Sequence, residues 1–204
     1  MLKFIKSRKS GVQNYLPFIM ILVAVIGLTA SFVLTADKIH VLKDPNFIPE
    51  CNINPIISCG SVMTSKQAEI AGVPNTVLGL IGFSSLGTIG LMLLAGASFK
   101  RWFWRLVWAG TIFGLIFVHY LMYESIFVIK SLCPYCMTVW VSTILLFWYT
   151  TLYMFSEGHL KVSKKYREIV DFAQKHHIDI YVGWILLIVG LIIYKFWYYW
   201  QTIV

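Results

Sequence analysis

Five long stretches almost free of charged residues limit the architectures open to this chain. They cover roughly residues 15–36, 75–97, 106–128, 133–155 and 180–200. Each is long enough to cross a bilayer as a helix, since about 20 residues at about 1.5 Å per residue span the hydrocarbon core. Hydrophobic residues make up 58% of the chain and charged residues only 13%, which excludes an ordinary soluble domain. We predict one all-α membrane domain with five transmembrane helices over residues 1–204.

The basic residues predict how these helices are oriented. Of the 17 lysines and arginines, 12 lie in the N-terminal arm, the 98–105 turn and the 157–179 loop. The positive-inside rule puts these segments in the cytoplasm, and the 37–73 loop and the start of the fourth span outside it. This distribution explains the net charge of +8 without nucleic acid. We expect a multi-pass cell-membrane protein with a cytoplasmic N-terminus, whose first span is retained and not cleaved as a signal peptide.

Two polar segments outside the spans have weaker patterns. Residues 157–179 can form an amphipathic surface helix, with Val162, Tyr166, Ile169, Val170 and Ala173 on its apolar side. Residues 63–71, within the 37–73 loop, can form a short helix.

The main candidate for chemistry is the Cys133-Pro134-Tyr135-Cys136 motif at the start of the fourth span. Pro134 suits the first position of a helix, where its missing N–H costs nothing. A helix beginning there places free N–H groups and a positive dipole end beside Cys133. Such a site favours the thiolate, which is the nucleophilic form of cysteine. The motif therefore predicts a reactive dithiol, while a structural disulfide or half of a zinc site remains open.

A second cysteine pair, Cys51 and Cys59, lies in the 37–73 loop and so on the same predicted membrane face. Two dithiols on one oxidising face can pass electrons by thiol–disulfide exchange. A mobile loop pair can reach an external protein, and a fixed pair at a helix start can serve an acceptor in the bundle. Two electrons arriving there require a two-electron acceptor, for which a lipid-soluble quinone is the obvious candidate. Its ring would be lined by some of the aromatic residues at that level: Phe83, Tyr120, Tyr123, Tyr135 and Trp140.

The cysteines also allow two metal-binding interpretations, and the third predicted span contains two ionisable residues. A four-cysteine zinc site requires four converging thiolates, and the spacing from Cys51 to Cys59 is unusual for one half of it. Covalent c-type haem is excluded because Met137, and not histidine, follows the motif. Within the third span, we expect Glu124 to lie at the membrane interface and His119 to make a structural hydrogen bond.

The cysteines, together with two further features, resemble the vitamin K epoxide reductase family, in particular its prokaryotic members that drive disulfide formation. Ser65 follows six residues after Cys59, where the family has a serine or threonine. Pro74-Asn75 opens the second span, where the family has an asparagine that binds the quinone. The resemblance covers roughly residues 15 to 155 and implies a four-helix bundle around a quinone, with the fifth helix at its periphery.

The resemblance also implies a role for each of these residues. Cys136 would lie next to the quinone, Cys133 would exchange with Cys59, and Cys51 would meet the external thiol protein. Asn75 would hold a carbonyl of ubiquinone or menaquinone through its side-chain amide, and Ser65 would support the site. The implied electron donor is a separate thioredoxin-fold (DsbA-like) protein, since no fused thioredoxin-like domain follows before Val204.

One departure from the family concerns Trp140, four residues after Cys136. The vertebrate enzyme has a tyrosine at this position, whose hydroxyl helps to bind its ligand. An indole N–H donates a hydrogen bond but does not accept one. The change weakens the case for epoxide reduction and suits a plain quinone. A reductase of quinone or vitamin K epoxide that is driven by external dithiols stays as the alternative. A non-enzymatic membrane protein with structural disulfides or a zinc site is the alternative from another class.

Overall fold

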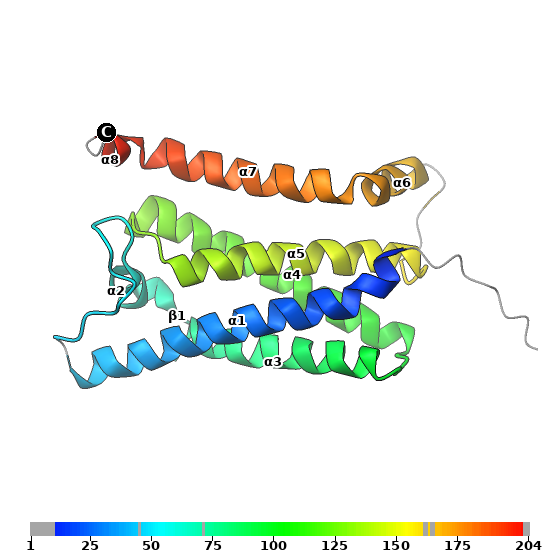
Figure 1. Ribbon diagram of the computed structural model, residues 1–204, viewed down its shortest axis with the longest axis horizontal. Coiled ribbons are helices and arrows are strands. Elements are labelled where there is room, and N and C mark those ends of the chain that lie inside the picture. The colour runs from blue at the N-terminus through cyan, green and yellow to red at the C-terminus, as the bar shows by residue number, and fades with distance from the viewer. Residues whose placement is uncertain (1–10, 45, 71, 161–162, 164–165, 202–204) are drawn as a thin grey trace, which may run out of the picture.

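The computed structural model describes residues 11–201, except 45, 71, 161–162 and 164–165. Five long helices make up most of this part of the chain (Figure 1). They are α1 (Gly11–Lys43), α3 (Asn75–Leu94), α4 (Arg101–Tyr123), α5 (Pro134–Ser156) and α7 (His177–Lys195). The α4 helix continues directly into a π-helix, η2 (Glu124–Ile129). Among the described residues, five helical segments are thus long and apolar enough to cross a membrane, which confirms the expected all-α membrane fold.

The helices α1, α3, α4 and α5 form the bundle. The α1 helix packs along both α3 and α5, and α4 packs along α5. At Gly27 the two helices α1 and α3 come very close, because a Cβ atom there would lie 2.5 Å from Cγ of Phe83. Small residues permit such close approach where helices meet in a membrane. The cysteine loop and α2 lie at one end of this bundle, and the α3–α4 turn lies at the other (Figure 1).

The α7 helix lies at the side of the bundle and has no buried residue. Its first turn is attached to α5, since Trp148 Nε1 donates to the His177 carbonyl at 2.8 Å and Tyr149 OH lies 2.9 Å from His177 Nδ1. Its end is attached through Phe196, which is buried in the same apolar cluster as Trp140. The expected 180–200 span is therefore interrupted at Phe196, and a short helix, α8 (Trp197–Trp200), follows.

The polar segment before α7 contains the amphipathic helix α6 (Arg167–Lys175). Ile169 and Phe172 are exposed on its apolar side. Val162, which the sequence pattern placed on the same side, lies outside the described residues.

The first helix is longer than its apolar stretch. It continues through Asp37 and ends at Lys43, so the loop expected from residue 37 begins later. This extension fixes the loop, because Lys38 Nζ donates to the Met63 carbonyl at 2.8 Å and pairs with the Glu69 carboxylate at 3.1 Å. Lys38, just outside the apolar stretch, therefore connects the end of α1 to the loop.

The loop itself contains four short elements. They are α2 (Cys59–Met63), the 3-10 helix η1 (Lys66–Ala68), and the antiparallel strands β1 (Glu69–Ile70) and β2 (Val73–Pro74). The prediction of a helix over residues 63–71 is wrong. The α-helix of this loop starts earlier, at Cys59, and ends at Met63. Ser58 is the reason: its Oγ accepts from Ser61 N at 3.2 Å and caps α2.

Candidate functional site

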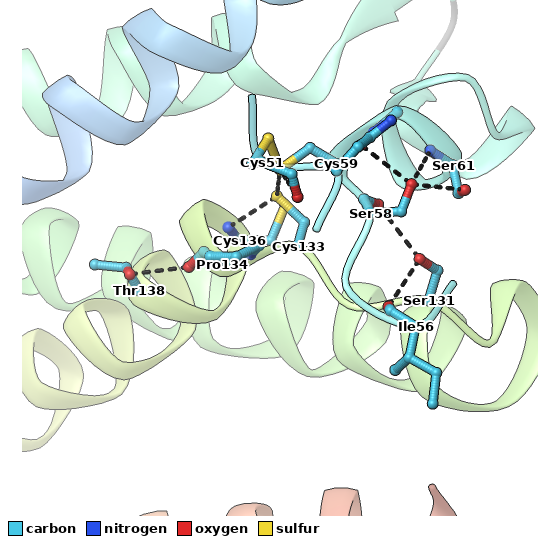
Figure 2. Close-up of a disulfide and its surroundings, with 12 residues drawn as sticks. Cys51, Ile56, Ser58, Cys59, Ser61, Ser131, Cys133, Pro134, Cys136 and Thr138 are labelled. Carbon is cyan, nitrogen blue, oxygen red and sulfur yellow. Dashed lines mark hydrogen bonds between the residues drawn. A yellow bond between two sulfur atoms is a disulfide. The ribbon is translucent and has the colours of Figure 1, made fainter. Parts of the chain in front are cut away.

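The loop cysteines and the helix cysteines are held together by a short parallel bridge between Ile57 and Leu132. Ser58 N donates to the Leu132 carbonyl at 2.9 Å, and Leu132 N donates to the Ile56 carbonyl at 2.7 Å. Ser131 Oγ adds a bond to the Ile56 carbonyl at 3.1 Å (Figure 2). Cys133 directly follows Leu132 and Cys59 lies two residues after Ile57, so the bridge brings the two cysteines close together.

The sulfur atoms of three cysteines form one cluster. Cys51 and Cys59 form a disulfide, and Cys133 and Cys136 are free thiols. The Cys133 Sγ lies 3.3 Å from the Cys59 Sγ, which is contact distance for exchange (Figure 2). Cys133 is also the N-cap of α5, where its sulfur accepts from the backbone N–H of Cys136 at 3.4 Å.

The surroundings of Cys133, just outside α5, favour its thiolate. A hydrogen bond from the Cys136 side chain lowers the pKa of the Cys133 thiol, and the backbone N–H groups of Cys136 and Tyr135 lower it further. Burial and the negative charge of Asp37 act in the opposite direction but do not cancel the effect. A thiolate attacks disulfides, and a thiol of lowered pKa is also the better leaving group, so Cys133 can exchange with Cys59 in either direction.

The four cysteines differ in how they can be reached. Cys59 and Cys133 have no exposed surface, and Cys51 is 9% exposed. Cys136 is half-buried and lines a pocket that also touches Cys59 and Cys133. The exposed surface of the loop pair thus belongs to Cys51, and that of the helix pair belongs to Cys136.

The pocket lies between the loop and the helices α1, α3, α4 and α5. Its wall is mainly apolar, with a few polar side chains among the apolar ones. The lining residues on the helices are Leu34, Lys38, Asn75, Thr76, Leu121, Cys136 and Trp140, and those on η2 are Glu124, Ser125 and Ile129. An apolar wall with a few polar groups beside reactive thiols suits a ring-shaped, weakly polar ligand.

Asn75 lines this pocket at the first turn of α3. Its Nδ2 donates to the Gln67 carbonyl at 2.7 Å, and its Oδ1 is buried without a hydrogen-bond partner among the described residues. The carbonyl partner fixes the orientation of the amide, because only the nitrogen can donate to it. The amide nitrogen expected to bind a quinone carbonyl thus already uses one of its two hydrogens, and the unpartnered atom is an acceptor.

The other predicted site residues lie as follows. Ser65 lines the pocket, and its Oγ donates to the Val62 carbonyl at 2.7 Å. Trp140 is buried and also lines the pocket. The four other aromatic residues considered for the ring do not line it. Phe83 packs against Gly27, Tyr135 packs against the cysteine cluster, and Tyr120 and Tyr123 are exposed.

Of the two ionisable residues in the third span, His119 lies as expected and Glu124 does not. His119 Nδ1 lies 2.8 Å from the Leu115 carbonyl of its own helix, which confirms a structural hydrogen bond. Glu124 lines the pocket, where sequence reasoning had placed it only at the membrane interface. In the sequence, Glu124 stands out only as the one carboxylate in an apolar span that is otherwise uncharged. Lys38 and Gln67 also line the pocket and had no such signal.

The described part of the chain contains no group of three or more histidine, cysteine or acidic residues placed to hold a metal ion. Cys51 and Cys59 are bonded to each other here, so they are not present as two thiolate ligands. The arrangement places a free thiol against a disulfide, which is the geometry of thiol–disulfide exchange.

Comparison with known protein families gives a match over most of the bundle. The matching model is that of the vitamin K epoxide reductase family, and it covers residues 18–151. This range contains α3, α4, the cysteine loop and both cysteine pairs. With five apolar helices and a thiol pair in contact with a disulfide, the chain is a multi-pass membrane oxidoreductase that belongs to the vitamin K epoxide reductase family.

Proposed function

We propose that the protein oxidises a separate thioredoxin-fold protein outside the cytoplasm and passes the electrons through its two cysteine pairs to a membrane quinone. In this way it would support disulfide-bond formation. The observation that carries the proposal is the 3.3 Å contact between the Cys133 and Cys59 sulfurs, which joins the loop pair to the helix pair.

The relay consists of two dithiol–disulfide exchanges followed by reduction of the acceptor. A dithiol of the partner reduces the Cys51–Cys59 disulfide, entering at Cys51, and becomes a disulfide itself. The Cys59 thiolate then attacks Cys133 of a Cys133–Cys136 disulfide, and Cys136 leaves as a thiolate. Attack of Cys51 on Cys59 releases Cys133 and restores the loop disulfide. This last state, with the loop pair oxidised and the helix pair reduced, is the one in the structure.

The final acceptor takes two electrons and two protons from the Cys133–Cys136 dithiol, which becomes a disulfide. A ubiquinone or menaquinone ring fits the requirements of the pocket, because Cys136, Asn75 and Trp140 line it together. Trp140 offers an apolar face and Asn75 a polar contact. The family is associated with quinones in general, which adds support to this assignment.

The proposed orientation puts the cysteines at the extracytoplasmic face of the cell membrane. The α3–α4 turn with Lys100 and Arg101 lies at the opposite end of the bundle from the cysteine loop (Figure 1). Basic residues at that end favour a cytoplasmic location. A secreted or anchored thioredoxin-fold protein would then meet Cys51 from outside.

A coupled assay tests the proposal. The purified protein is mixed with a reduced thioredoxin-fold protein and a short-chain ubiquinone or menaquinone, and both partner thiols and hydroquinone are measured. We expect two partner thiols to disappear for each hydroquinone formed. Quinone epoxide offered in place of quinone should not be consumed. Loss of epoxide, or failure of every dithiol to reduce quinone, would contradict the proposal.

Substitution Asn75→Ala should weaken the use of quinone more than it weakens folding. The lost side chain removes one ligand hydrogen bond, so we expect KM for quinone to rise about tenfold. The bond to the Gln67 carbonyl is also lost, at a cost of about 1 kcal/mol in folding stability.

The matched control is Ser84→Ala, which removes a polar side chain from the same helix. Ser84 Oγ donates only to backbone carbonyl groups of that helix. Thermal unfolding in detergent is measured beside the kinetics. If Asn75→Ala mainly lowers the yield of folded protein and leaves KM unchanged, Asn75 serves the structure and not the quinone.

A further inference from the structure

The turn that follows α4 is unusual and lies on the wall of the pocket. Residues Glu124–Ile129 form a π-helix, and it ends at Lys130, whose φ of 57° is left-handed. Such π-turns are rare and occur frequently at functional sites. Here the turn is fixed by a hydrogen bond from Ser125 Oγ to the Ser131 carbonyl. It brings Glu124 to the pocket that Cys136 also lines.

Most polar side chains of the pocket already have partners within the protein. These contacts join Lys38 to Met63 and Glu69, Ser65 to Val62, Ser125 to Ser131, and Thr35 to Thr76. Two lining residues differ within the described part of the chain: Asn75 Oδ1 and Glu124 Oε2 are buried and have no hydrogen-bond partner. Both therefore have unused hydrogen-bonding capacity beside the same reactive thiol.

A buried carboxyl group without a partner is costly if it is ionised. Lys38 is the cationic side chain among the described residues that line the pocket, and it pairs with Glu69 and donates to the Met63 carbonyl. A protonated carboxyl group carries no charge and has an O–H to donate. The unpartnered Glu124 Oε2 lies at the wall of this apolar pocket, where a carboxyl O–H can donate to a bound acceptor.

The proposed reaction needs such a group. Two electrons move from the Cys133–Cys136 dithiol to the quinone, and two protons must reach the two quinone oxygens. We propose that Glu124 is the acid that delivers one of these protons, an inference that rests on the function proposed above. Its carboxyl O–H bond breaks as the new O–H bond forms on the quinone oxygen. The carboxylate then regains a proton from those released by the two thiols, so protons and electrons balance.

The test separates proton transfer from binding. Glu124→Gln keeps the shape and an N–H donor but has no proton to transfer. We expect it to slow hydroquinone formation by the dithiol-reduced protein about 10²-fold, as is usual for loss of a general acid. Quinone affinity, measured by quenching of tryptophan fluorescence, should change less than about threefold. Reduction of the Cys51–Cys59 disulfide by an external dithiol should keep the wild-type rate and so report a correct fold.

Glu157→Gln is the matched control, because Glu157 Oε1 is also buried without a partner but lies just after the far end of α5. It should leave all three measurements unchanged. Infrared difference spectra give a readout independent of turnover: quinone binding to the oxidised protein should perturb a protonated carboxyl band that is absent in Glu124→Gln and kept in Glu157→Gln. Glu124→Asp keeps a transferable proton and should be faster than Glu124→Gln.

The outcomes are distinct. A Glu124→Gln variant that forms hydroquinone at the wild-type rate overturns the inference, as does a loss of quinone affinity as large as the loss of rate. If the wild type itself reduces no quinone with any dithiol, the proposed function fails first, and the inference fails with it.

Discussion

Substitution Cys136→Ala should abolish quinone reduction by the protein, with a loss on the order of 10³-fold or more. The helix pair can no longer form its disulfide, so the electrons held on Cys133 have no two-electron route to the acceptor. Cys136 is also the only cysteine of the helix pair with exposed surface beside the pocket. The measurement is hydroquinone formation in the coupled assay with a reduced thioredoxin-fold protein.

The same variant should retain the first half of the reaction. Its loop disulfide is intact, so one partner disulfide per molecule should form in a single burst before turnover stops. Thr138→Ala is the matched control, since Thr138 lies on the same helix and its Oγ bonds only to the Pro134 carbonyl. If Cys136→Ala reduces quinone at the wild-type rate, electrons leave the protein by another route and the relay is wrong.

The membrane architecture was predictable from the sequence because it depends on local composition. The apolar stretches and the helix start at Pro134 are properties of neighbouring residues, and the structure has a helix in each stretch. The expected peripheral position of the last helix also agrees with the absence of buried residues in α7. Helix ends were less predictable, since α1 continues past its apolar stretch to Lys43 for reasons of tertiary contact.

The composition of the pocket was predictable only in part. Cys136, Asn75, Ser65 and Trp140 all line it, as their positions in the family pattern implied. The sequence did not predict which polar atoms of the pocket lack a hydrogen-bond partner, because this depends on how the loop folds against the helices. The Asn75 amide is engaged by a backbone carbonyl eight residues earlier, and a sequence does not reveal that contact.

The contact between Cys59 and Cys133 was another feature that only the fold could supply. The two residues are 74 positions apart, and the Ile57–Leu132 bridge that aligns them is a single backbone pairing. The family pattern implied that they exchange, but no local signal marks the bridging residues. Glu124 was misjudged for a related reason: the π-turn that carries it to the pocket has no reliable sequence signature.

The substitution Cys51→Ser should trap the two cysteine pairs joined by a disulfide. In Cys51→Ser, Cys59 can still attack the Cys133–Cys136 disulfide, but no Cys51 thiol remains to release it. A Cys59–Cys133 disulfide should therefore accumulate when the helix pair has been oxidised by quinone, and it should be absent after reduction by an external dithiol. Cys51→Ser/Cys59→Ser is the control, in which oxidation should yield only Cys133 joined to Cys136.

Peptide mapping of Cys51→Ser by mass spectrometry, after alkylation of free thiols, is the most direct measurement of the relay. The relay predicts a peptide containing Cys59 joined to one containing Cys133, found in the quinone-oxidised sample and missing from the dithiol-reduced one. Recovery of Cys59 as a free, alkylated thiol in both samples would contradict it, because electrons could then not pass between the loop pair and the helix pair.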